Sequence, residues 1–464
     1  MWRFTFLLFA PVMLTAQTAS DVAGAERLFE TWMNSQLAFR GLPGVVVGVV
    51  SDQKLVWARG FGFADVDARL PMMAATKFRM ASHSKLFTST AIMQLRDQGK
   101  VRLDDPVIKY LPWFQVKPVE AGDPPITIEE LLTHSSGLSR EAGSHWTDFN
   151  FPDVGEVRAY IAGSPAVYSP QVRWKYSNLA LTIAGMVVEA VSGEPYAGYV
   201  QKHIFDPLGM TASSFDKRVP DLAVGYGRRM PDGRRQSVPF VDAKAMGAAT
   251  GLTSTVEDMA KFVSLQFRTG SPILSTGALR EMHRVRMMEN DWTRGNAIGF
   301  AVNKTGDKLY IGHGGRYPGY LTQTTIQLDD KVGVIVLTNG NDSDPGEIAQ
   351  HLMQIVGSAV AKASAISKPA IPWEPSWSRF AGTYRTVFSE SAVVEMNQQL
   401  VLFDPTGVNP ERYNKLAPLG GGQFRLEAPA GGGAVGEVVR FVELPGGGMR
   451  MYTGGSYSER VLMQ

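Results

Sequence analysis

The stretch FRMASHSKLFTSTAIMQL, residues 78–95, places a Ser-x-x-Lys pair, Ser82 and Lys85, at the start of a helical pattern. Apolar residues recur behind the pair at helical spacing and Gly99 follows where a helix would stop, which predicts a helix over residues 84–98. Positions i and i+3 of a helix share one face, so the Lys85 ammonium can approach the Ser82 hydroxyl. Ser82 is therefore expected at or just before the N-terminus of this helix.

The chemistry of this pair suits nucleophilic catalysis. A Ser hydroxyl is a weak nucleophile without an adjacent base, and a Lys serves as that base when burial or a neighbouring cation lowers its pKa. Backbone N–H groups at a helix N-terminus can also stabilise an oxyanion. The alternative is a Ser that caps the helix beside a solvated Lys.

Two further Ser-x-x-Lys pairs occur in the chain, and roughly one or two are expected by chance at this length. Ser51 and Lys54 lie in the polar turn of a predicted β-hairpin, where no helix holds the two side chains on one face. Ser214 and Lys217 lie in a polar loop that ends at Pro220. Only the pair at Ser82 has favourable geometry.

Five segments appear in the order found in serine β-lactamases of the class C type and in their relatives: FRMASHSKLFT, ITIEELLTHSSGL, WKYSNLALTIAG, GLTSTVEDMAKF and IGHGGRYPGY. The chain thus resembles this family over about residues 23–361; the relatives include penicillin-binding D,D-peptidases, D-aminopeptidases and β-lactamase-like esterases. The resemblance implies an α/β (α+β) fold of the β-lactamase/transpeptidase type, in which helices flank an antiparallel sheet beside an all-helical subdomain. The strand patterns near residues 44–65 and 298–339 agree with such a sheet.

The second family motif corresponds to Tyr176-Ser177-Asn178. The resemblance implies that Tyr176 shuttles a proton between Ser82, Lys85 and the leaving group, and that Asn178 holds Lys85 and the substrate amide. A tyrosine in that role is expected among cations that lower its pKa or share its proton. The alternative is an ordinary aromatic residue near the start of a helix.

The third family motif is Lys-Thr-Gly, and a literal copy stands at residues 304–306. The family places this motif on a strand that is followed by a turn, a strand, a polar turn and an apolar strand. That order fits His313-Gly314-Gly315, whereas residues 304–306 fall in the preceding hairpin turn. If so, the resemblance implies that the backbone N–H groups of Ser82 and Arg316 form the oxyanion hole.

This third motif also bears on the substrate. The Lys and Thr of the lactamase version grip a substrate carboxylate, but here a mostly neutral His313 and Gly314 replace them. Arg316 could restore a cation, although its direction cannot be read from the sequence. Esters or amides without a carboxylate are therefore favoured, and we expect the substrate-binding residues to be Asn178, His313, Gly315 and Arg316.

Of the other histidines, none is assigned a direct part in catalysis and none is expected to bind a metal. His134 is expected to be structural, in a turn that ends a helix. His83 is expected to point into the site, with its role open. The seven His residues show no HExxH motif and no pair at ligand spacing backed by carboxylates, so we predict no metal and no cofactor.

The 464 residues predict at least two folded units. Residues 1–19 have the order of a secretory signal, with an N-terminal anchor helix as the alternative. We predict a hydrolase domain over 20–362, a Pro-, Ser- and Ala-rich linker over 363–376, and a small β-barrel domain, lipocalin-like by resemblance, over 377–464. The barrel is either a stability module or a lid over the cleft.

Composition narrows the location and the partners. The chain has no Cys, which excludes disulfides, a Cys nucleophile and a lipidated N-terminal Cys. Lys plus Arg (46) nearly balance Asp plus Glu (44), and no basic run with interleaved aromatic residues indicates nucleic acid. We expect an exported periplasmic or secreted protein that is not a lipoprotein, has no stable membrane insertion and acts on a small molecule or short peptide; the oligomeric state is open.

The sequence therefore predicts a serine hydrolase that cleaves an amide or ester through an acyl-enzyme on Ser82, either a D-amino-acid peptidase or a small-ester esterase. A true β-lactamase is the second interpretation. A protein that binds or senses peptidoglycan fragments or β-lactams without turnover is the third. Intact Lys85 and Tyr176 count against the last of these, because a pure binder needs neither.

Overall fold

The computed structural model describes residues 10–143, 145–215, 219–306, 308–366, 371–406, 413–427 and 434–461. The chain forms two compact units, Met1–Ser367 and Lys368–Gln464. The predicted linker, 363–376, contains the boundary between them. Residues 1–9 of the predicted signal segment lie outside the described residues, and helix α1 (Ala10–Arg40) begins within that segment. No helix among the described residues is both long and apolar enough to cross a membrane.

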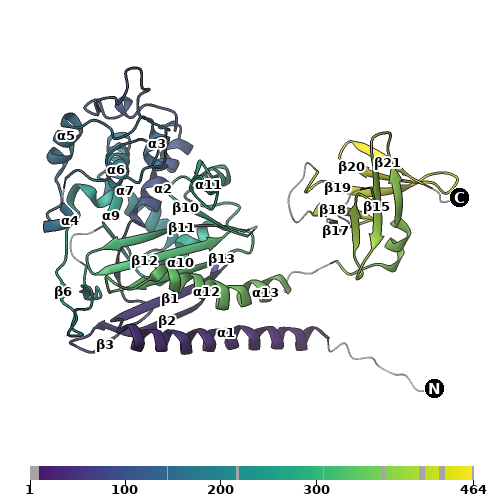
Figure 1. Cartoon of the computed structure of the whole chain (residues 1–464), viewed down its shortest axis with the longest axis horizontal. Coiled ribbons are helices and arrows are strands. Elements are labelled where there is room, and N and C mark those ends of the chain that lie inside the picture. The colour runs from purple at the N-terminus through teal and green to yellow at the C-terminus, as the bar shows by residue number, and fades with distance from the viewer. Residues whose placement is uncertain are drawn as a thin grey trace. The chain divides into compact units, whose positions relative to one another are not determined.

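A nine-stranded antiparallel sheet forms the centre of the first unit, in the order β3-β2-β1-β13-β12-β11-β10-β9-β8 (Figure 1). The first and last strands of the sheet in chain order, β1 and β13, are neighbours in its interior. They pair from Val45 to Ser51 on β1 and from Val332 to Thr338 on β13. The strands are β1 (Gly44–Ser51), β2 (Lys54–Asp65), β3 (Leu70–Pro71), β8 (Met287–Met288), β9 (Arg294–Asn296), β10 (Ala301–Thr305), β11 (Lys308–Tyr317), β12 (Tyr320–Gln327) and β13 (Val332–Thr338).

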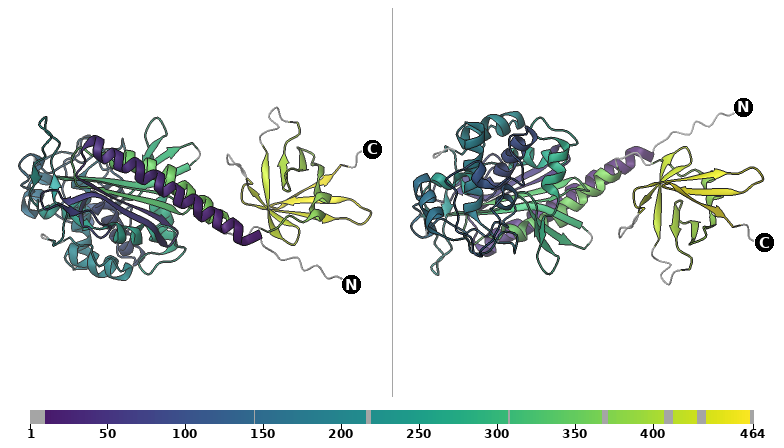
Figure 2. Two further views of the ribbon diagram at one scale, coloured as in Figure 1. Left: turned by 90° about the horizontal axis from the view of Figure 1, so that it is seen from below. Right: turned by 90° about the horizontal axis from the view of Figure 1, so that it is seen from above.

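Both faces of this sheet are covered, and the period-two alternation of its valines assigns each side chain to a face. On β1, Val45, Val47 and Val49 pack under α1 with residues of the C-terminal helices, while Val46 and Val50 face the core of the helical region. Figures 1 and 2 show α1 lying along one face of the sheet beside the C-terminal helices. These are α12 (Pro345–Leu352), the π-helical turn η4 (Met353–Gly357) and α13 (Ser358–Ile366).

The opposite face carries the helical region, as predicted. Its elements are α2 (Ser84–Asp97), η1 (Val107–Lys109), α3 (Ile128–Leu132), α4 (His145–Asp148), α5 (Val154–Gly163), α6 (Asn178–Ser192), α7 (Tyr196–Val200), η2 (Gln201–Phe205), α8 (Asp206–Leu208), η3 (Lys244–Met246), α9 (Gly247–Thr250), α10 (Val256–Leu265) and α11 (Thr276–His283). Two short ribbons complete it: β4 (Phe78–Ala81) with β7 (Leu252–Ser254), and β5 (Gly225–Tyr226) with β6 (Ser237–Val238).

Helix α2 is the most enclosed helix of this region, since its residues 84–95 are all buried. Phe87 on α2 and Met80 on the preceding strand β4 are fully buried in the core. The sequence predicted one buried face, but neighbours surround α2 on all sides. The polar residues of α2 are therefore buried as well. Most of them bond inside the protein, whereas Ser89 Oγ and Gln94 Oε1 have no hydrogen-bond partner among the described residues.

The second unit is a closed, eight-stranded antiparallel barrel, which confirms the predicted barrel fold. A short helical segment, η5 (Pro375–Phe380), precedes it and contributes Trp377 and Phe380 to its core. The strands are β14 (Gly382–Arg385), β15 (Glu390–Glu395), β16 (Leu400–Phe403), β17 (Asn414–Gly420), β18 (Gln423–Glu427), β19 (Val438–Glu443), β20 (Met449–Thr453) and β21 (Ser456–Arg460). Closure leaves no free edge strand among the described residues of this unit.

Candidate active site

Ser82 lies at the turn between β4 and α2. Ala81 has a φ of 50°, a left-handed conformation that non-glycine residues adopt rarely, and Ser84 begins the helix two residues after Ser82. The Ser84 hydroxyl secures this turn by donating to the carbonyl of Ala81 at 2.7 Å and by accepting the N–H of Leu252. Ser82 is thereby held at the floor of a cavity.

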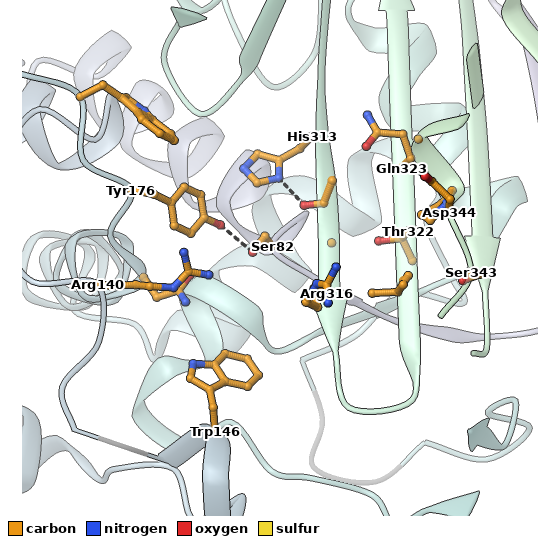
Figure 3. A pocket seen from close by; sticks show the side chains of 17 residues that line it. Ser82, Arg140, Trp146, Tyr176, His313, Arg316, Thr322, Gln323, Ser343 and Asp344 are labelled. Atoms are coloured by element: carbon orange, nitrogen blue, oxygen red, sulfur yellow. Dashed lines mark hydrogen bonds between the residues drawn. The ribbon is translucent and has the colours of Figure 1, made fainter. Parts of the chain in front are cut away.

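Ser82 Oγ accepts two hydrogen bonds. Lys85 Nζ lies 2.9 Å from Oγ and the Tyr176 hydroxyl lies 2.7 Å from it, as Figure 3 shows for the tyrosine. The Lys85–Ser82 contact has the i,i+3 spacing expected from the sequence. The Tyr176 contact joins residues 94 positions apart, and the order of motifs indicated it. The three side chains form one connected cluster.

Lys85 is completely buried, and this burial dominates its acid–base behaviour. Desolvation of the ammonium lowers the pKa of Lys85 well below its usual range; Arg140 adds to that effect and Glu141 opposes it. Nζ donates its second hydrogen bond to the carbonyl of Ala249 at 2.8 Å. A neutral Lys85 amine has one lone pair, and once the amine rotates so that this lone pair faces Oγ it can accept the Ser82 proton.

The pKa of Tyr176 is raised, whereas cations were expected to lower it or to share its proton. Burial raises the pKa of Tyr176 to about 12, although its hydrogen bond to Ser82 and the charge of Arg140 act in the opposite direction. Lys85 and Arg140 both lie 5.0 Å from the ring centroid, yet neither lowers the pKa below the ordinary value. Tyr176 is therefore a protonated hydroxyl near neutral pH, and the basic group of the cluster is Lys85.

His134 supports Tyr176 from behind. The two rings lie 4.4 Å apart between centroids, and His134 Nδ1 accepts the N–H of Ser177 at 3.1 Å. Because it accepts this bond, His134 is neutral, in line with burial and the charge of Lys85, which hold its pKa well below the usual range. His134 thus holds the backbone of Ser177 and the ring of Tyr176 in place, which is a structural role.

His83 does not face the cavity, contrary to expectation. Its ring is fully buried and contacts Thr324 Oγ1 at 2.9 Å and Thr322 Oγ1 at 3.1 Å, behind strand β12. Burial lowers the pKa of His83 to about 4, so the ring is neutral near pH 7. It connects α2 to the sheet, which explains why a polar residue can occupy this interior position.

His313-Gly314-Gly315 lies on β11 and lines the cavity, whereas residues 304–306 lie on β10 and in the turn after it, and do not line it. His313 Nδ1 contacts the carbonyl of Gly314 at 2.6 Å. Burial and the charge of Lys85 lower the pKa of His313 to about 3. The imidazole is thus neutral, and it cannot replace the Lys of a Lys-Thr-Gly motif as a carboxylate partner.

Gly315 allows β11 to approach the backbone before Ser82. A Cβ at this position would lie 2.4 Å from the carbonyl oxygen of Met80 and 2.2 Å from Thr322 Oγ1. Any side chain here would therefore separate β11 from the Ser82 turn. The glycine is required by packing against β4 rather than by an unusual backbone conformation.

The N–H of Arg316 points toward the cavity side of β11. Tyr317 and Tyr320 flank a two-residue turn and form the hydrogen-bonded pair that closes it, so the next pair, Arg316 and Leu321, directs its backbone groups away from β12. On that side β10 pairs with β11 only as far as Gly312. Arg316 therefore has no neighbouring strand there among the described residues. Its side chain is exposed at the cavity rim.

Asn178, the first residue of α6, also lines the cavity. The expected contact with Lys85 is not made: Asn178 Nδ2 donates to Glu141 Oε1 at 2.6 Å, and Lys85 bonds Ala249 instead. Asn178 Oδ1 is buried and has no hydrogen-bond partner among the described residues. Glu141 could not be recognised from the sequence, because it lies in an irregular loop without a periodic pattern.

The cavity has a volume of about 850 Å³ and lies between the helical region and the sheet. Figure 3 shows Arg140, Trp146 and Tyr176 on the helical side of Ser82, and His313, Arg316 and Gln323 on the sheet side. Of the charged and tryptophan residues that line the cavity, Arg316 was predicted from the sequence. Four were not predicted: Arg140, Trp146, Trp174 and Asp344. In the part of the chain that the structure describes, no three His, Asp or Glu side chains are grouped to hold a metal ion.

Comparisons with known proteins agree with this arrangement. A family model described as Beta-lactamase matches residues 29–357. Esterase EstB of Burkholderia gladioli is 32% identical over 235 residues, which is 48% of this chain and 59% of the esterase. The matched regions span 66% or less of the length of the first curated relatives.

Two solved structures share the fold. The octameric penicillin-binding protein homologue from Pyrococcus abyssi has a TM-score of 0.65 at 24% identity and covers 93% of this chain and 99% of its own. A D-stereospecific amidohydrolase from Streptomyces sp. has a TM-score of 0.60 at 22% identity and covers 70% of this chain and 97% of its own. At these identities the likeness concerns the fold.

Proposed function

Because the chain belongs to the beta-lactamase family, we propose that it is a serine hydrolase that cleaves a small ester or amide through an acyl-enzyme on Ser82. The observation that carries this proposal is the cluster in the cavity, where Ser82 Oγ lies 2.9 Å from Nζ of a buried lysine and 2.7 Å from the hydroxyl of a half-buried tyrosine. A nucleophile, a base and an acid are thus present together.

In the first step, neutral Lys85 takes the proton of Ser82 as Oγ attacks the carbonyl carbon of the substrate. The backbone N–H groups of Ser82 and Arg316 bind the oxyanion that forms. Tyr176 gives its proton to the leaving group as the tetrahedral intermediate collapses, and the Lys85 ammonium restores that proton. Water then attacks the acyl-enzyme while the same groups act in reverse.

Neutral His313 supports substrates without a carboxylate at this end of the cavity, since a carboxylate would meet an imidazole with a pKa of about 3. Asp344 adds a negative group to the lining. Similarity to an esterase and to a D-stereospecific amidohydrolase supports esters and amides of small acids, including D-amino-acid derivatives. A β-lactam carboxylate would have to pair with Arg140 or Arg316, the two cations of the lining, rather than with His313.

The direct test is the intact mass of the protein after brief mixing with p-nitrophenyl propionate. We expect a propionyl adduct that maps to Ser82 and is absent from Ser82→Ala, together with release of nitrophenol. Circular dichroism of the mutant confirms that it is folded. A folded wild-type protein that forms no adduct and releases no nitrophenol would overturn the proposal and favour a binding protein.

The pH dependence of kcat/KM for p-nitrophenyl propionate should report the pKa values of Lys85 and Tyr176. Lys85 acts as a base only when neutral, so activity rises with pH through its lowered pKa, at a pH far below the ordinary lysine range. Tyr176 acts as an acid only when protonated, so activity falls near its pKa of about 12. Rates over a range of pH, in buffers of constant ionic strength, should show a broad plateau through neutral pH. An acid limb near the ordinary lysine pKa would contradict this assignment.

A further inference from the structure

Helix α9 makes little more than one turn, and its last carbonyls lack helical partners. A carbonyl inside an α-helix accepts the N–H four residues further along the chain. For Ala248 and Ala249 those N–H groups are taken elsewhere: the N–H of Leu252 donates to Ser84 Oγ at 2.9 Å, and that of Thr253 donates to a carbonyl of the loop after α8 at 2.9 Å. Both carbonyls of α9 therefore need donors from another element.

Helix α2 supplies those donors from two side chains on one face. Lys85 Nζ donates to the carbonyl of Ala249 at 2.8 Å, and Thr88 Oγ1 donates to the carbonyl of Ala248 at 2.6 Å. Lys85 and Thr88 are three positions apart, so their side chains share a face of the helix. All four residues are buried. The catalytic lysine and the threonine one turn after it thus hold two consecutive carbonyls of α9.

Tyr196 determines which way the Thr88 hydroxyl donates. The Tyr196 hydroxyl lies 2.7 Å from Thr88 Oγ1, and either oxygen could be the donor. Thr88 has one proton, and a buried Ala248 carbonyl without a donor would cost about 1–3 kcal/mol. The carbonyl of Ser84 also lies within reach of Thr88 Oγ1, but farther away, at 3.2 Å. Tyr196, which burial keeps protonated by raising its pKa, is therefore the donor to Thr88.

We propose that Thr88 and Tyr196 are positioning residues for the general base, because they hold the end of α9 so that the carbonyl of Ala249 meets Lys85 Nζ. The proposal rests on the function proposed above. The Ala249 oxygen matters most once Lys85 has taken the Ser82 proton, since a buried ammonium needs acceptors for its N–H groups. Neither Thr88 nor Tyr196 lines the cavity that holds Ser82, so both act through α9.

The first test replaces Thr88 with Val, which removes the hydroxyl and keeps a β-branched side chain. The buried carbonyl of Ala248 then loses its donor, and the end of α9 turns toward another partner, which moves the carbonyl of Ala249 away from Lys85. We expect kcat/KM for p-nitrophenyl propionate near neutral pH to fall roughly tenfold or more. Thr88→Ser, which restores the hydroxyl, should stay within about threefold of the wild type.

The pH profile separates positioning from a general loss of packing. A carbonyl accepts more strongly from an ammonium than from a neutral amine, so loss of the Ala249 contact lowers the pKa of Lys85 further. Because kcat/KM rises with pH through that pKa, the acid limb of Thr88→Val should move to lower pH while the plateau falls. The substitution retains the other charged and titratable groups around Lys85: His83, His134, Arg140, Glu141, Tyr176 and His313. A loss of packing alone would lower the plateau without moving the limb.

The matched control is Thr90→Val, the same substitution on the same helix. Thr90 is also fully buried, but its Oγ1 donates to the carbonyl of Leu86 within α2, at 2.8 Å. This variant should keep kcat/KM within about twofold of the wild type and leave the acid limb in place. An equal fall in both valine variants, or a folded Thr88→Val protein that reacts at the wild-type rate, would overturn the proposal.

Tyr196→Phe decides the matter if Thr88→Val does not fold. Without the Tyr196 hydroxyl, the Thr88 hydroxyl is free to turn from Ala248 to Ser84, so kcat/KM should fall about threefold or more and the acid limb should move in the same direction. An unchanged rate and limb in folded Tyr196→Phe would overturn the inference. Failure of the proposed function is seen separately, because wild-type Ser82 would then form no propionyl adduct with p-nitrophenyl propionate.

Discussion

Replacing Lys85 with Met is expected to lower kcat/KM for p-nitrophenyl propionate by about 10⁴-fold or more, in the range seen when the general base of a nucleophile is removed. Met has a similar length and no charge, so it fills the fully buried space left by the lysine stem. Ser82 then keeps its hydrogen bond from Tyr176 but loses the group that takes its proton. A tyrosine with a pKa of about 12 cannot replace that base near neutral pH.

The measurement is the rate of the acylation burst by stopped flow. Lys304→Met is the matched control, because Lys304 is exposed on β10 in the literal Lys-Thr-Gly copy and does not line the cavity. That control should acylate at the wild-type rate. A normal burst in folded Lys85→Met would mean that another group deprotonates Ser82, and an inactive Lys304→Met would show that the strand assignment of the third motif is wrong.

Replacing Gly315 with Ala should have the second largest effect, a fall in kcat of about 10²- to 10³-fold, as for the loss of one oxyanion donor. The added Cβ would lie 2.4 Å from the Met80 carbonyl and 2.2 Å from Thr322 Oγ1, so β11 must move away from the Ser82 turn. That movement separates the two N–H groups proposed to bind the oxyanion. Overpacking of this kind also costs about 1–3 kcal/mol of stability.

Single-turnover kinetics and thermal unfolding measure these two effects together. Gly163→Ala is the matched control, because its Cβ would meet no atom within 4 Å and Gly163 is exposed at the end of α5. It should leave the rate of acylation and the melting temperature nearly unchanged. A Gly315→Ala protein that reacts at the wild-type rate would contradict this role. It would show that the oxyanion site does not depend on the close approach of β11 to the Ser82 turn.

Much of the fold follows from local pattern. The β1–β2 hairpin, the helix after Ser82 and the strands after residue 298 lie where apolar periodicity predicts them, and Pro318-Gly319 forms the turn between β11 and β12. Local sequence was sufficient here because period and turn residues act over short stretches of chain. The choice of His313-Gly314-Gly315 over the copy at residues 304–306 also needed the strand order that the family resemblance implies.

Local pattern was insufficient for the partners of the reactive groups. Ala249, which accepts from Lys85, lies 164 residues from it, and Glu141, which holds Asn178, lies in a loop without periodicity. His83 follows the nucleophile directly, yet its ring turns to Thr324 on the sheet. Contacts of this kind depend on where distant elements pack, which spacing along the chain does not encode.

The sequence by itself determined that Ser82 and Lys85 share a helix face, that Tyr176 follows at a motif position, and that a glycine-rich strand lies after residue 310. The tertiary structure alone decided the chemical state of these groups. Burial lowers the pKa of Lys85 and raises that of Tyr176, and it leaves Asn178 Oδ1 without a partner among the residues that the structure describes. The physical reason is that desolvation depends on everything packed around a group, whereas helix periodicity depends only on its neighbours in the chain.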